Sequence, residues 1–204
     1  MHVALSYSHI RLLQEKLMSE QLFAVGKVES LCVNGSPTSS INILPEGIFR
    51  DTHRGFQRAL SGHDGAYLKT SALKKGHAVF NWRSWTALSL EELQAIEYAI
   101  SCSILPGILF ENMIISGIPN FSQLQPTSRL VFPLEKESQA ILAVWEENGP
   151  CRTVGERVES ASGGHTTSAE FVRAAHKKRG LMGFVLSPGV VRVGDQIRVY
   201  GPVR

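Results

Sequence analysis

The sequence predicts a mostly β protein of the α+β class, built as a closed or partly closed barrel with a few peripheral helices. Short apolar segments between turn residues recur from residue 111 to residue 200. Few segments carry the 3.6-residue periodicity of a helix. With 43% hydrophobic and 19% charged residues, the chain has a globular composition and is not expected to be disordered. Many short strands with few helices are typical of barrels.

The 204 residues suit one domain. We expect the barrel over residues 24–204 and an N-terminal helical extension over residues 1–23. Within 8–24 the apolar side chains have helical spacing, so this helix is expected to pack on the domain or to contact another copy in an oligomer. The alternation over 24–33 then predicts a strand.

The next part of the chain is predicted from its turn residues. The segment 34–40 is expected to be a loop, and the polar, Gly-rich stretch 61–77 an exposed loop. Residues 78–88 predict one strand. Ser89 and Glu92 have the spacing of a capping box, which begins a helix that ends near residue 101.

The second half alternates strands and turns, with one further helix. Thr167 and Glu170 form another capping box, and the helix after it is expected to run about 10 residues. Its last turn should hold basic residues that favour the helix dipole, namely Lys177, Lys178 and Arg179. The expected strands lie in 111–117, 128–133 and 140–149, with three more in 182–200.

The charge and the sequence motifs exclude several classes of protein. A net charge of +3 without a basic stripe argues against a nucleic-acid partner. No signal peptide precedes the domain, and no apolar run is long enough to cross a bilayer, so we expect a cytoplasmic protein without a membrane partner. The chain also lacks the motifs of P-loop enzymes, Rossmann dehydrogenases, zinc proteases and serine hydrolases.

Cys151 is the first candidate for chemistry. The three cysteines form no CxxC pair, which excludes a zinc ribbon and fits a reducing compartment. Cys151 follows Gly149-Pro150 at the end of a predicted strand, in a loop, and Arg152 beside it would favour a reactive thiolate. The alternative is an inert, part-buried cysteine, which is the expected role of Cys32 and Cys102.

A second cluster of polar residues lies in the segment 50–55. In an extended chain Asp51 and His53 share one face, so the carboxylate could orient the imidazole. The arginines here, Arg50, Arg54 and Arg58, could bind a phosphate. The alternative is a solvated turn with ordinary ion pairs. Asn112, directly before an apolar strand, is expected to fix a turn.

These places resemble the MOSC family, the domain named for the C-terminal part of molybdenum cofactor sulfurases. Five motifs occur in the family's order over residues 24–200. They are the first strand 24–33, Asp51-Thr52-His53-Arg54-Gly55, Pro106-Gly107 through Glu111-Asn112 to Gly117, Pro150-Cys151, and Arg179-Gly180 through Gly194-Asp195 to Ile197. Arg50 and Phe110 stand where the family has glycines.

The resemblance implies a MOSC-like β-barrel that binds the molybdenum cofactor, a molybdopterin whose dithiolene holds the metal. Position by position, it makes Cys151 the catalytic thiol, as metal ligand or sulfur carrier. It places five residues near the cofactor: Arg50, Asp51, His53, Asn112 and Arg152. No pyridoxal phosphate site is evident in the chain.

The resemblance implies an enzyme that reduces N-hydroxylated compounds or transfers sulfur to a metal centre. The alternative is a non-catalytic persulfide carrier that delivers sulfur to a partner. A third reading is a small β domain whose cysteines are structural. A cysteine desulfurase or an electron-donor protein is the expected partner, because the chain carries neither a desulfurase part nor an iron–sulfur cysteine set.

Overall fold

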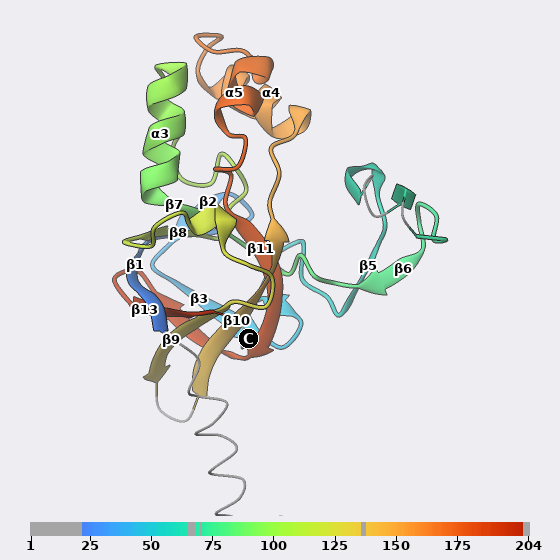
Figure 1. The fold of residues 1–204 in the computed structure, drawn as a ribbon, viewed down its shortest axis with the longest axis vertical. Coiled ribbons are helices and arrows are strands. Elements are labelled where there is room, and N and C mark those ends of the chain that lie inside the picture. The colour runs from blue at the N-terminus through green and yellow to red at the C-terminus, as the bar shows by residue number, and fades with distance from the viewer. Residues whose placement is uncertain (1–21, 65–67, 70, 136–137, 202–204) are drawn as a thin grey trace, which may run out of the picture.

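A closed seven-stranded β-barrel forms the centre of the computed structural model, which describes residues 22–64, 68–69, 71–135 and 138–201 (Figure 1). The strand order is β13-β9-β10-β11-β7-β8-β1, and β13 pairs with β1 to close the ring. Only β7 and β8 run parallel among these pairs. The strands are β1 (Leu22–Val33), β7 (Trp85–Ser89), β8 (Met113–Ser116), β9 (Arg129–Glu135), β10 (Ser138–Glu147), β11 (Leu181–Ser187) and β13 (Gln196–Tyr200).

The remaining described strands extend the barrel or leave it. β2 (Ser36–Thr38) adds to the end of β1, and β12 (Gly189–Arg192), β3 (Ser40–Leu44) and β4 (Gly47–Ile48) form a small sheet. β5 (Gln57–Ala59) and β6 (Ala78–Phe80) pair in an arm that projects sideways from the barrel, and the arm also carries the short helix η1 (Gly62–Asp64) (Figure 1).

Three α-helices gather at one end of the barrel: α3 (Leu90–Ile100), α4 (Arg152–Ala161) and α5 (Ser168–Ala174) (Figure 1). Helix α3 is the crossover that lets β7 and β8 run parallel, as such pairs require. The short helix η2 (Phe121–Gln123) follows β8. No helix in the described ranges is long and apolar enough to cross a membrane.

Two separate apolar clusters follow from this arrangement. The barrel core gathers inward side chains from the strands, such as Val28, Trp85 and Val199. The helical cluster gathers side chains from the helices and the loop before β8, including Ile96, Val158 and Phe171. Cys102 and Cys151 pack against this second cluster, whereas Cys32 is buried on β1.

The predicted mostly β, α+β fold with a barrel and peripheral helices is confirmed, as are the strand over 24–33 and the helix after Ser89. The N-terminal helix prediction falls largely outside the described residues, and its last residues, 22–24, are strand. The expected single strand 78–88 is two strands, because a turn at Asn81–Ser84 separates β6 from β7.

Other local predictions need correction. The loop expected over 34–40 contains β2, since Cys32 and Pro37 pair across a tight turn that starts at Asn34. Ser89 does cap α3, but the Glu92 side chain accepts from Ser122 rather than from the cap residue. At α5 both halves of the Thr167 capping box are present.

Candidate functional site

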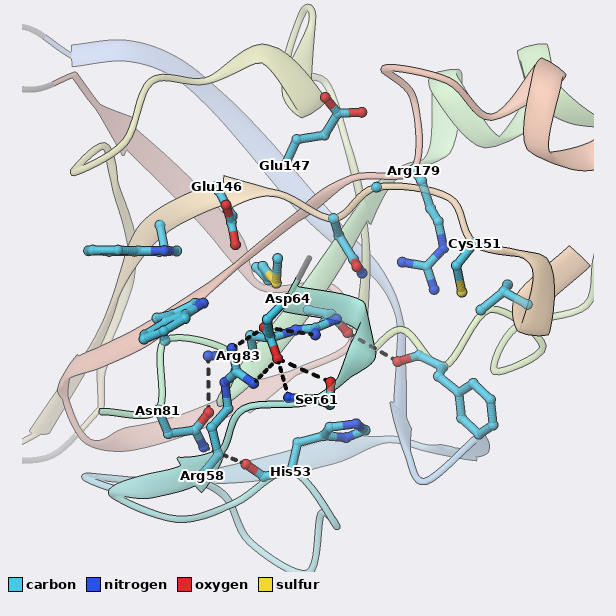
Figure 2. Close-up of a pocket in the computed structure, with 18 of the residues that line it drawn as sticks. His53, Arg58, Ser61, Asp64, Asn81, Arg83, Glu146, Glu147, Cys151 and Arg179 are labelled. Atoms are coloured by element: carbon cyan, nitrogen blue, oxygen red, sulfur yellow. Dashed lines mark hydrogen bonds and ion pairs between the residues drawn. The ribbon is translucent and has the colours of Figure 1, made fainter. Parts of the chain in front are cut away.

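A cavity of about 1000 Å³ lies between the arm and the barrel end near the helices. Its wall comes from five parts of the chain: the segment 52–64, residues 81–86, Phe110, the end of β10 through the first turn of α4, and Arg179 with Met182 around the start of β11. Figure 2 shows the charged side chains of this wall pointing toward one space, with Cys151 and Arg179 on one side and Arg58, Asp64 and Arg83 on the arm side.

Cys151 lines this cavity as the N-cap residue of α4. The sequence placed it in a loop and missed the helix that follows. Helix α4 contains Gly155, and a Cβ there would come within 2.4 Å of the Ser168 hydroxyl, so this glycine allows α4 and α5 to pack closely. No side chain caps α4, so its first amide N–H groups point outward beside the cysteine.

The role predicted for Arg179, at the end of a helix, is wrong. Helix α5 ends at Ala174, so Arg179 does not sit in its last turn. Instead its side chain is 5% exposed and lines the cavity, where one guanidinium nitrogen donates to the Leu109 carbonyl at 2.6 Å. Its Nε has no partner in the described structure. The one signal for it is the Arg-Gly before β11.

The charge of Arg179 is only partly balanced by its surroundings. Burial lowers its pKa to about 10, while the charges of Cys151 and Glu111 oppose that shift. A guanidinium with that pKa stays protonated at neutral pH. The Glu111 carboxyl has its own pKa raised by burial, although the Gly107 amide that donates to it works in the other direction.

The arm contributes a second pair of arginines. Arg58 binds the Asp64 carboxylate with two nitrogens at 2.9 and 2.5 Å, and Arg83 lies 4.0 Å from the same carboxylate. Burial would raise the pKa of Asp64, but the bonds from Arg58 and the Ser61 amide hold it well below its usual range. The loop expected to be exposed over 61–77 therefore contains a buried carboxylate that fixes the arm.

Aromatic rings cover the wall beside these arginines. Trp82 and Trp145 stack with ring centroids 5.6 Å apart, and the Arg58 guanidinium lies 4.5 Å from the Trp82 centroid. Glu146 lies on the same wall, and burial raises the pKa of its carboxyl while Arg83 opposes the shift.

Asp51, His53 and Asn112 come together as the sequence suggested. Asp51 accepts from the His53 amide at 2.7 Å, lies 3.2 Å from the His53 ring, and accepts from Asn112 at 2.8 Å. Burial would raise the pKa of Asp51, but these bonds outweigh it and lower the value. Asp51 and Asn112 are buried, so His53, whose side chain is 63% exposed, is the member of the three that reaches the large cavity.

Arg50 and Arg152 do not line the cavity. The Arg152 side chain is 87% exposed and pairs with Glu156 on the outside of α4. Arg50 lies in the left-handed region with φ +66°, and so does Phe110 with φ +57°. Glycine adopts this conformation readily, which explains why these two positions are glycines in the family pattern.

The side chains around the cavity fit a ligand that supplies most of its own metal ligands. The described residues contain no group of three or more His, Cys, Asp or Glu side chains that could hold a metal ion. The cavity offers one thiol, a helix N-terminus and four arginines beside three carboxylates, Asp64, Glu146 and Glu147. Asp64 is already bound by Arg58, so the remaining cations can bind an anionic ligand.

Two sequence comparisons relate this chain to known proteins. The MOSC domain family model matches residues 74–198, which include Cys151 and Arg179 but not Asp51 or His53. YuaD of Bacillus subtilis (strain 168), named for metal-sulfur cluster biosynthesis, is 33% identical over 156 residues, which are 76% of each chain.

Solved structures give the same result. A crystal structure of YuaD from Bacillus subtilis has a TM-score of 0.77 and 28% identity, over 88% of this chain and 97% of that one. YiiM from Escherichia coli, at 12% identity and a TM-score of 0.53 over 87% of this chain and 71% of its own, shares the fold. The family match and the YuaD relationship together show that this chain belongs to the MOSC domain family.

Proposed function

We propose that this chain binds the molybdenum cofactor in the large cavity and that Cys151 is the thiol that reacts there. The observation that carries the proposal is the position of Cys151, on the cavity wall at the N-terminus of α4 and beside the buried guanidinium of Arg179 (Figure 2). Cysteine sulfur is a soft metal ligand and a nucleophile, so a thiol on this wall can bind a metal or attack an electrophile that enters the cavity.

The residues present fit such a cofactor. Its dithiolene supplies metal ligands, whereas the described residues gather no group of three that could hold a metal ion, and its phosphate is an anion that arginines bind well. Among the cavity residues, Arg54, Arg58, Arg83 and Arg179 are cationic, while Arg50 and Arg152 point elsewhere. We therefore assign the phosphate to Arg54 and Arg58, the arginines of the segment 52–64, rather than to Arg50. When bound, the cofactor supplies a redox-active molybdenum centre.

The chain's own groups have separate tasks in this proposal. The Cys151 sulfur is the soft ligand that meets the metal. Arg179 holds the Leu109 carbonyl and keeps a positive charge beside that sulfur. Asp51, held by Asn112, fixes the loop that presents the His53 ring to the cavity.

A persulfide carrier is the second candidate, and two observations favour it. YuaD, the relative described above, is named for metal-sulfur cluster biosynthesis. Cys151 also has no second cysteine on the cavity wall, so a persulfide on it would not collapse into a disulfide there. In this reaction the Cys151 thiolate takes the terminal sulfur of a donor persulfide, and the donor leaves as a thiolate. A cysteine desulfurase is the partner we propose for this step, and an electron-donor protein for a reductase.

The molybdenum content of the purified protein distinguishes the cofactor-binding function from the persulfide carrier. Wild type, Cys151→Ser and Cys102→Ser are produced in a host that makes the molybdenum cofactor, and molybdenum and pterin are measured in each purified protein. We expect both in the wild type and in Cys102→Ser, and a large loss of molybdenum in Cys151→Ser. If molybdenum is absent from all three, the cofactor proposal is wrong. A mass gain of one sulfur on Cys151 after incubation with a cysteine desulfurase would then support the carrier.

A further inference from the structure

A buried cation, Arg179, lies beside the Cys151 sulfur. Arg179 is 95% buried, since its exposed fraction is 5%, and its Nε has no hydrogen-bond partner in the described structure. Figure 2 shows its guanidinium beside the Cys151 sulfur. The side chain lines the cavity, and a buried guanidinium that keeps its charge on a cavity wall favours an anionic ligand there.

Two further groups add to this charge. The N-terminus of α4 begins at Cys151 without a side-chain cap, so its outward amides are free to donate to an anion. Arg83 also faces the cavity. It shares Asp64 with Arg58, which takes that carboxylate with two bonds, while Arg83 stays at 4.0 Å. The charged or titratable groups that face Arg83 are Arg58, Asp64, Glu146 and Cys151. Those that face Arg179 are Arg83, Glu111 and Cys151.

We propose that Arg179 and the N-terminal amides of α4, with Arg83 as a second cation, form an anion subsite directly in front of the Cys151 sulfur. The molecule that meets Cys151 therefore carries a negative charge at its reacting end. This inference deepens the proposed function, because it states the charge class of the reactant at the same thiol. Arg179 and Arg83 are positioning residues in this site, since they hold the anion and do not react.

The test compares two alkylating reagents that differ in charge. Iodoacetate is anionic and iodoacetamide is neutral. Each forms a sulfur–carbon bond with the same thiolate and releases iodide, so the ratio of their rates cancels the thiolate fraction and reports the electric field met by the reagent. Rates at Cys151 and Cys102 are read separately by peptide mass spectrometry in the folded protein.

We expect a higher iodoacetate-to-iodoacetamide ratio at Cys151 than at Cys102. Arg179→Gln should lower the Cys151 ratio about tenfold, and Arg83→Gln should lower it less. Arg179→Lys, which keeps the charge, should retain most of it. Arg152→Gln is the matched control, because it removes the same charge one residue from Cys151 on a side chain that points outward. Equal ratios at the two cysteines, or equal effects of Arg152→Gln and Arg179→Gln, would overturn the subsite.

A measurement on the wild type covers the case in which the Arg179 variants do not fold. Inorganic sulfate, at constant ionic strength, should protect Cys151 from iodoacetamide in a saturable way and leave Cys102 unprotected. Absence of protection would count against the subsite. The alkylation and protection experiments use protein from a host that makes no molybdenum cofactor, so that no metal occupies the thiol. If this protein prefers iodoacetate but protein from the cofactor-making host contains no molybdenum, the cofactor proposal alone fails. If molybdenum is present there but the alkylation shows no preference, the subsite alone fails.

Discussion

At the scale of single residues, Asn112 joins three parts of the chain that the site depends on. Its side chain donates to Asp51 at 2.8 Å and to the Cys32 carbonyl at 3.4 Å, and it accepts from the Thr86 amide at 2.9 Å. Each of these groups lies on a different element. Asn112 therefore ties the loop that carries His53 to both β1 and β7.

Asn112→Ala should lower the free energy of unfolding by roughly 2–3 kcal/mol, because it leaves buried polar groups without partners. Asn42→Ala is the control, since Asn42 is exposed on β3 and its change should stay within about 0.5 kcal/mol. Urea unfolding of both variants measures the difference. Equal stability of the two variants would mean that Asn112 does not hold the loop.

Arg50 and Phe110 allow a paired prediction at the same scale. Both adopt a left-handed backbone, which costs a residue with a side chain roughly 1–2 kcal/mol. The Arg50 side chain is exposed and lies near only the Phe49 ring among the contacts described, whereas the Phe110 ring lies 3.7 Å from the Arg157 guanidinium carbon. The strain is therefore compensated at Phe110 more than at Arg50.

Arg50→Gly should raise the free energy of unfolding by up to about 1 kcal/mol, because strain relief exceeds the added entropy of the unfolded chain. Phe110→Gly should lower it by roughly 1–2 kcal/mol, since the ring contact and its buried apolar area are lost. Thermal unfolding of the two variants gives the order. The reverse order would show that the Arg50 side chain has a stabilising contact of its own.

At the scale of elements, the sequence predicts those strands and helices whose formation depends on local patterns of residues. Alternating apolar residues predict the strand 24–33, and the Ser89 cap predicts the helix that follows it. Both elements are present. Helix α4 has few such signals. The Cys151 side chain does not cap it, and Gly155, a poor helix former, lies within it. Its formation depends on packing against α5, which is tertiary and invisible to local patterns.

The same reasoning explains the errors at the site. Arg179 lies in a run of three basic residues, and such a run is typical of a solvated helix end. It becomes a cavity residue because α5 stops early and the Leu109 carbonyl lies within reach, 70 residues away in the sequence. By contrast, Asp51 and His53 are two residues apart, so their contact could be predicted. The role of Asn112 beside them was implied only by the family motif.

At the scale of the whole molecule, the two apolar clusters stabilise different parts of the fold. The barrel core closes the sheet, whereas the helical cluster holds Cys151 and α4. Val158 belongs to the helical cluster and Val199 to the barrel core, and both are essentially fully buried. Because α4 has no side-chain cap and packs mainly on α5, we expect it to open more readily than the barrel.

Val158→Ala and Val199→Ala remove the same two methyl groups, so each should cost roughly 2 kcal/mol of global stability. Their local effects should differ. Hydrogen exchange, followed by mass spectrometry on peptides over 152–161, should quicken more in Val158→Ala, because only that change loosens α4 within the folded barrel. Val199→Ala should instead quicken the amides that exchange by global unfolding. If both variants quicken α4 equally, the helices and the barrel open as one unit, and the geometry around Cys151 then depends on the whole fold.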